Sequence, residues 1–179
     1  MVKRADLIRK LSGGDRRSIG GSEEVVSEVL ADGRLFAPLF ECLLNHDRLV
    51  QMRAADAVEK ITRFRPDLLR PCKATLINRV AKNEHREVRW HVAQLIPRLE
   101  LNSAEQRKAV TILTDYLKDE SRIVKTFSMQ ALADIATKDE RLRSSVVKRL
   151  EELMKDGSPA MRSRGTKLLA KLKRHESSI

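Results

Sequence analysis

Aromatic residues are scarce in this sequence, and so are cysteine, glycine and proline. The 179 residues include four Phe, one Trp, one Tyr, two Cys, seven Gly and five Pro. Two cysteines cannot form the multi-disulfide framework of a small secreted domain. The sequence also lacks a run of about 18 apolar residues, which excludes a predicted membrane span, and its first residues lack the apolar core of a signal peptide. We therefore expect a soluble, cytoplasmic protein.

Aliphatic and basic residues make up much of what is present. Hydrophobic residues form 41% of the chain, which is too many for a disordered protein. Because aromatic residues are few, the interior must consist mainly of Leu, Val, Ile and Ala, a composition that favours packed helices. The formal net charge is +11, which would attract polyanions or acidic protein surfaces.

A repeat of about 37 residues runs through the sequence. Four segments superpose without gaps, and the first apolar residues of their second helices, here called the anchors, are 38, 36 and 37 residues apart. Apolar or small residues recur four, seven and eight positions after each anchor, which is one face of an α-helix. Another amphipathic segment precedes each one, so every repeat is predicted to be helix, turn, helix. The anchors are Val50, Val88, Val124 and Met161.

The turns between the paired helices share their chemistry. Each begins with Asn or Asp, whose short polar side chains stabilise turns. Three residues then stand where a helix N-cap belongs, namely Asp47, Ser121 and Ser158, and Pro159 fills the first helical position after Ser158. His85 is a poor cap in the remaining repeat. The turn residues are Asn45, Asn83, Asp119 and Asp156.

This pattern resembles the HEAT-repeat (armadillo-like) family of helical solenoids. The family pattern has an acid in the turn, kept here by Asp119 and Asp156, and then Val-Arg, a small pair and a Leu. The resemblance implies an all-α fold, a right-handed α-α superhelix of about four helical hairpins plus an N-terminal cap. It also implies a single domain over 1–179, with capping helices at 1–32, repeats at 33–64, 66–100, 103–138 and 140–174, and a tail at 175–179.

Two local features predict interruptions of the helices. Four of the seven glycines lie within residues 13–21. No strand precedes this segment and no Gly-Lys-Ser/Thr follows, so a linker is favoured over a phosphate-binding loop. Prolines at Pro38, Pro71 and Pro97 are expected to bend the helices that contain them.

Outward side chains of the second helices are the candidates for partner binding, because in stacked helical pairs these helices line the concave face. At 100° per residue the apolar residues of the second repeat cluster within about 60°, which leaves Trp90 near the opposite pole. A tryptophan with an arginine rim is typical of an interface hot spot; the alternative is that Trp90 covers a groove between helices. We predict a protein or peptide partner that contacts Met52, Arg53, Arg89, Trp90, Gln94, Arg98, Gln130, Arg164 and Lys167.

Basic residues concentrate near the C-terminus. Eleven bases and three acids lie between Arg141 and Arg174, whereas residues 23–47 contain six acids and one base. A second hypothesis is therefore nucleic-acid binding through the basic C-terminal third. In three repeats a basic residue directly follows the anchor. It could contact a phosphate, but we favour the alternative that it pairs with the acid in the turn of a neighbouring repeat. These bases are Arg89, Lys125 and Arg162.

Catalytic chemistry finds little support in the sequence. A weaker similarity to the HEAT-like alkylpurine DNA glycosylases rests on basic inner helices with a tryptophan, and those enzymes act with a nearby carboxylate. Here Gln94 follows Trp90 by one turn, and the nearest predicted concave acids, Asp56 and Glu59, belong to another repeat. The similarity therefore implies DNA binding at most. No two of the four histidines are spaced i, i+4, and we predict no catalytic residues, metal or cofactor.

Overall fold

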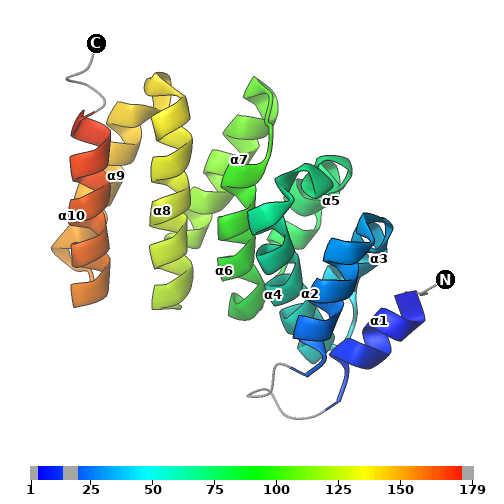
Figure 1. Cartoon of the computed structure of the whole chain (residues 1–179). Coiled ribbons are helices and arrows are strands. Elements are labelled where there is room, and N and C mark those ends of the chain that lie inside the picture. The colour runs from blue at the N-terminus through cyan, green and yellow to red at the C-terminus, as the bar shows by residue number, and fades with distance from the viewer. Residues whose placement is uncertain (1–3, 14–19, 175–179) are drawn as a thin grey trace. The chain divides into compact units, whose positions relative to one another are not determined.

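Ten α-helices and six short 3-10 helices make up the regular structure that the computed structural model describes, which covers residues 4–13 and 20–174 (Figure 1). No β-strand occurs among these residues. The all-α prediction is thus confirmed. The predicted tail and the middle of the glycine-rich segment lie outside the described residues. The chain divides into two compact units, Met1–Leu101 and Asn102–Ile179, which are called unit 1 and unit 2 below.

Unit 1 is a stack of short helices. Helices α2, α4 and α6 pack in succession, α4 against both of the others, while α1 and α3 contact each other and α4. In chain order the elements are α1 (Arg4–Leu11), α2 (Ser22–Ala31), η1 (Gly33–Leu35), α3 (Phe36–Glu41), η2 (Cys42–Leu44), α4 (Arg48–Phe64), η3 (Pro66–Cys72), α5 (Lys73–Asn78), η4 (Val80–Lys82), α6 (Arg86–Leu95) and η5 (Ile96–Arg98).

Unit 2 consists of longer helices that form two hairpins. Helix α8 contacts α7, α9 and α10, and α9 packs against α10 (Figure 1). Its elements are α7 (Ser103–Tyr116), α8 (Arg122–Lys138), η6 (Glu140–Leu142), α9 (Arg143–Lys155) and α10 (Pro159–Arg174).

The predicted apolar face of each second helix is the buried face. All four anchors are at most 5% exposed, and the residues four positions later are buried too. Those later positions hold small side chains in three repeats. At Gly165 in unit 2, for example, a Cβ would overlap the Met154 side chain. Small residues therefore let the helices of one unit approach closely, as the sequence indicated.

The same turn recurs in both units. The Oδ1 atoms of Asn45, Asn83 and Asp119 each accept a hydrogen bond at 2.8 Å from the backbone N–H two residues on. Asp47 then accepts from Leu49 N at 2.8 Å, which confirms it as an N-cap. Ser121 and Ser158 accept longer bonds of 3.5 and 3.4 Å from backbone N–H groups in the first turns of α8 and α10. His85 makes no such bond.

The residue after the anchor was expected to pair with the acid of a neighbouring turn. In two repeats it instead donates a hydrogen bond to a backbone carbonyl of its own turn. Arg89 Nε donates to Asn83 O and Arg162 Nη1 donates to Gly157 O, both at 2.7 Å. In the first repeat Gln51 takes this position, and its Oε1 accepts from Asn83 Nδ2 of the next repeat at 2.9 Å. These bonds fasten α6 and α10 to their own turns and join the first two turns of unit 1.

Three of the four prolines of unit 1 lie in 3-10 segments, whereas Pro38 lies inside α3. Helix α6 ends at Leu95 and continues as the 3-10 helix η5, which contains Pro97. Pro66 opens the 3-10 segment before α5, and Pro71 lies inside that segment, which ends at Cys72. Proline lacks the N–H that an α-helix requires in its interior, which is consistent with 3-10 geometry at Pro66, Pro71 and Pro97.

Candidate functional site

Trp90 lies on the outward side of α6 but is partly covered. Its side chain is half-buried rather than exposed, and its ring centroid lies 3.7 Å from that of His91. Gln94, one turn later, donates from Nε2 to Trp90 O at 3.3 Å. Met52 has the equivalent position on α4 and is half-buried as well. Met52, Trp90 and Gln94, here called the Trp90 surface, are therefore uncharged and partly accessible.

Arg53 was predicted to contact the partner, but the structure makes it a buried structural residue. Its side chain is 2% exposed, and Nη1 donates to Leu11 O at 2.8 Å and to Gly13 O at 2.7 Å. These carbonyls lie at the end of α1, where a helix leaves its last C=O groups without internal partners. Gly20 has φ +54°, and a Cβ there would lie 2.7 Å from Arg53 Nη1. Arg53 thus secures α1 to α4 and is not available to a partner.

Arg98, another predicted contact, is largely occupied within unit 1. Its guanidinium donates to the Glu59 carboxylate at 2.5 Å, to Glu59 O at 2.7 Å and to Thr62 Oγ1 at 2.6 Å. Arg63 pairs with the same carboxylate, which is only 3% exposed. Burial raises the pKa of Glu59, but the hydrogen bonds from Arg63 and Arg98 outweigh burial and hold it below its usual range. Glu59 is therefore a buried ion-pair partner and not an exposed acid.

Asp56 is the centre of a second charge cluster in unit 1. Lys60 Nζ lies 2.9 Å from its carboxylate and also pairs with Glu23, while Ser22 Oγ donates to Asp56 at 3.2 Å. His91 Nε2 lies 3.9 Å from Asp56 Oδ1, which is an ion-pair distance and too long for a hydrogen bond. Burial raises the pKa of Asp56, but the interactions with His91 and Lys60 outweigh it and lower the pKa to about 2. The cluster connects α2, α4 and α6.

His91 was not among the predicted site residues. It is 2% exposed, and Nδ1 lies 2.6 Å from Glu87 O, to which it donates because a carbonyl oxygen only accepts. Nε2 is buried and makes no hydrogen bond within the described residues. A single histidine on the flank of a helix gives no pattern by which this placement could be predicted.

The predicted contacts of unit 2 lie around Asp134. Gln130 donates to this carboxylate at 3.0 Å, and its Oε1 accepts from Arg164 Nη1 at 2.9 Å. Lys171 Nζ lies 3.1 Å from the same carboxylate. Lys167 is exposed and has no side-chain partner in the described part of unit 2. Thus Gln130 and Arg164 belong to one network between α8 and α10, and Lys167 stands outside it.

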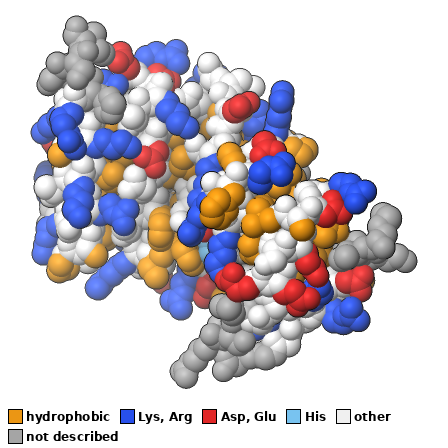
Figure 2. All heavy atoms as spheres, in the orientation of Figure 1, with side chains coloured by type: hydrophobic (Ala, Val, Ile, Leu, Met, Phe, Trp, Pro, Cys, Tyr) orange, Lys and Arg blue, Asp and Glu red, His pale blue; other side chains and the backbone are white. Residues whose placement is uncertain are grey.

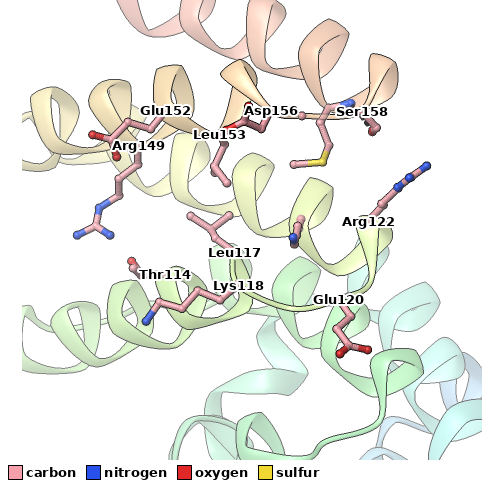
Figure 3. A pocket seen from close by; sticks show the side chains of 13 residues that line it. Thr114, Leu117, Lys118, Glu120, Arg122, Arg149, Glu152, Leu153, Asp156 and Ser158 are labelled. Carbon is pink, nitrogen blue, oxygen red and sulfur yellow. Dashed lines mark hydrogen bonds between the residues drawn. The ribbon is translucent and has the colours of Figure 1, made fainter.

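A pocket of about 540 Å³, here called the α7–α9 pocket, lies at one end of the unit 2 hairpins. It is lined by the C-terminal parts of α7 and α9 and by the starts of α8 and α10. Leu117 and Leu153 point toward one another at its centre (Figure 3). Arg149 and Lys118 extend toward one end of it, and Arg122 lies at the other (Figure 3). None of the contacts predicted from the sequence lines this pocket.

Several polar groups of the pocket have no partner. The side chains of Arg122, Lys125 and Arg149 make no ion pair or hydrogen bond with a described residue, and Thr114 Oγ1 is buried without one. The three acids of the lining, Glu120, Glu152 and Asp156, have no such partner either. Figure 2 shows Lys and Arg side chains scattered over the surface formed by α8, α9 and α10. The pocket therefore combines an apolar floor with unneutralised charges of both signs.

The two cysteines are buried and unpaired with each other. Burial raises the pKa of both thiols, that of Cys72 to about 11, which disfavours the thiolate. Residues 4–13 and 20–174 contain no group of three or more His, Cys, Asp or Glu side chains that could hold a metal ion. Within the same ranges, no helix has both the length and the apolarity that crossing a membrane requires.

The comparisons with known proteins concern fold alone. No known family profile matches the sequence, and no curated protein matches it either. Among solved structures the chain is similar to the crystal structure of an engineered protein, a target of the Northeast Structural Genomics Consortium, with a TM-score of 0.64. The two sequences are 18% identical, and the match covers 96% of this chain and 80% of the engineered one. At this identity the similarity supports a shared helical fold and carries nothing about function.

Proposed function

We propose that the protein is a non-catalytic scaffold of the HEAT-repeat type, which binds a protein partner through the outward sides of its inner helices. The inner helices are the second helices of the repeats, α4, α6, α8 and α10. Support for the repeat comes from the recurring turn at three junctions and from the buried anchors in all four helices. Repeats of this kind need neighbours to bury their apolar faces, and their free faces commonly serve as binding surfaces.

The Trp90 surface is the observation that carries this proposal. Two of the arginines expected around it, Arg53 and Arg98, are engaged within unit 1 by hydrogen bonds to backbone and to Glu59. Trp90, Met52 and Gln94 remain partly accessible and carry no charge. A partly covered aromatic side chain is already ordered, so a protein partner can desolvate its remaining area at low entropic cost.

Substitution of Trp90 tests the proposal. The tagged full-length chain is used to capture partners with and without nuclease, and the affinity of a nuclease-resistant partner is then measured for each variant. We expect Trp90→Ala and Met52→Glu each to weaken binding about tenfold. Phe64→Ala is the control, because Phe64 is 74% exposed on α4 but lies on another side of that helix. Equal affinity of wild type and both variants would remove the Trp90 surface from the proposal.

Nucleic-acid binding is the second candidate, and the free cations of unit 2 favour it. Lys148, Lys155 and Lys167 are exposed and make no ion pair with a described residue. Unpaired cations can displace counterions from phosphates, so the logarithm of the affinity for duplex DNA should fall linearly with log salt, with a slope near −0.9 per phosphate contacted. A triple Lys→Gln variant at these positions should flatten that slope. Absence of binding to duplex DNA at low salt would dispose of this candidate.

A further inference from the structure

We propose that the α7–α9 pocket is a second docking site, which accepts a peptide segment with apolar side chains flanked by carboxylates. The inference rests on the proposed function in so far as the partner is a protein, but it concerns a surface that contains no residue of the Trp90 surface.

The floor of the pocket suits aliphatic side chains. Leu117 and Met161 are 7% and 5% exposed, and half-buried Leu153 faces Leu117 across the centre (Figure 3). A volume of about 540 Å³ is within the range of roughly 300–1,000 Å³ that is usual for ligand pockets. Water in such a space gains little from an apolar floor, so its replacement by leucine-like side chains is favourable.

The rim supplies the preference for carboxylates. Arg122, Lys125 and Arg149 come from α8 and α9 and have no partner in the described structure, so each can bind a carboxylate without breaking an existing ion pair. The starts of α8 and α10 also border the pocket, and the positive ends of helix dipoles favour anions.

The acids of the rim favour a peptide over nucleic acid. Glu120, Glu152 and Asp156 lie between the cations around the pocket. A nucleic acid carries a negative charge at every nucleotide and would bring phosphates close to these carboxylates. A peptide carries its charges only where its sequence has them, so it can place carboxylates beside the cations and uncharged residues beside the acids.

Thr114 adds a hydrogen-bonding group to the same space. Its Oγ1 is buried, lines the pocket and has no hydrogen-bond partner among the described residues. A buried hydroxyl without a partner costs stability, and a carbonyl or carboxylate of the docked segment can accept its hydrogen bond. Thr114 comes from α7 and lies opposite Arg149 of α9, so the two side chains can bind the same end of a peptide (Figure 3).

A set of synthetic peptides tests the docking site with the full-length chain. The probe is a fluorescein-labelled peptide with two central leucines flanked on each side by two aspartates. Its affinity is measured by fluorescence anisotropy, beside versions in which lysine replaces aspartate or alanine replaces leucine. We expect only the original probe to bind well, with each altered version at least tenfold weaker.

Protein variants show whether the probe binds in the pocket. The double variant Lys125→Glu with Arg149→Glu should weaken the probe at least tenfold, whereas the matched control Lys148→Glu with Lys155→Glu changes the same charge outside the pocket and should alter affinity less than twofold. Leu153→Ser tests the floor, with circular dichroism as a check on folding. Equal losses in both double variants, or equal binding of the alanine peptide, would overturn the proposal. Trp90→Ala should leave probe binding unchanged, so failure at one surface is distinguishable from failure at the other.

Discussion

Unit 1 and unit 2 share the helix-turn-helix pattern but use their charged side chains differently. Unit 1 contains 19 Lys and Arg against 14 Asp and Glu, and unit 2 contains 17 against 11, so their net charges are similar. In unit 1, however, Arg53, Lys60 and Arg98 are engaged with groups of other helices. In unit 2, Arg122, Lys125 and Arg149 surround a pocket and have no ion-pair partner among the described residues. Pairing, and not the amount of charge, distinguishes a structural surface from one available for binding.

The two units also differ in the continuity of their helices. Four of the five prolines belong to unit 1, where 3-10 segments interrupt the chain before and after short α-helices such as α3 and α5. In unit 2 the helices α7–α10 have 13 to 17 residues, and Pro159 occupies a first helical position. Short helices have few internal hydrogen bonds, so unit 1 depends more on side-chain links between helices.

Removal of the Arg53 side chain should produce the largest difference in stability between unit 1 and unit 2. Arg53→Ala leaves Leu11 O and Gly13 O without their donor and creates a cavity, so we expect a loss of about 3 kcal/mol in the free energy of unfolding. Hydrogen exchange measured by mass spectrometry should show faster exchange in α1 and no change in α10. Arg34→Ala is the control, since that side chain is 90% exposed and pairs only with nearby Asp32. Unchanged protection of α1 would contradict a structural role for Arg53.

Acid should weaken unit 1 through Asp56. Its pKa is about 2 in the folded chain and 3.8 in the reference state, so ionised Asp56 stabilises the fold above about pH 4. This contribution is lost as the pH falls toward 2, and its full size is about 2 kcal/mol. Urea unfolding followed by the fluorescence of Trp90, the single tryptophan, measures the loss. The Asp56→Asn variant should be less stable than wild type at pH 5, and its free energy of unfolding should fall less steeply as the pH is lowered. A fall as steep as in wild type would mean that other carboxyl groups cause the loss of stability in acid.

The same substitution at two threonines should give the smallest but sharpest contrast. In unit 1, Thr62 Oγ1 donates to Val58 O at 2.8 Å and accepts from Arg98, so Thr62→Val should cost about 1 kcal/mol. In unit 2, Thr114 Oγ1 has no hydrogen-bond partner in the part of the chain that the structure describes, and Thr114→Val should be neutral or slightly stabilising. Thermal unfolding of both variants provides the measurement. Equal destabilisation would mean that the hydroxyl of Thr114 is satisfied after all.

Local structure followed the sequence closely. The helices, the Asn or Asp turns and the buried faces were all predictable, because amphipathic periodicity and capping depend on residues within one or two turns of each other. The all-α class and the burial of the anchors therefore needed no knowledge of neighbouring helices. The binding roles of Met52, Gln94 and Trp90 stay predictions, although Trp90 is less exposed than the helical wheel indicated.

By itself the sequence determined which side of each helix is apolar. Only the tertiary structure decided whether the residues that border the apolar side are buried or exposed. Arg53 and His91 lie beside the apolar stripe, where burial depends on what packs next to them. Arg53 is covered because it bonds to residues 40 and 42 positions earlier, and His91 because its helix packs against α4. The α7–α9 pocket likewise requires four helices at once. Such contacts join residues far apart in the chain, and a local pattern cannot encode them.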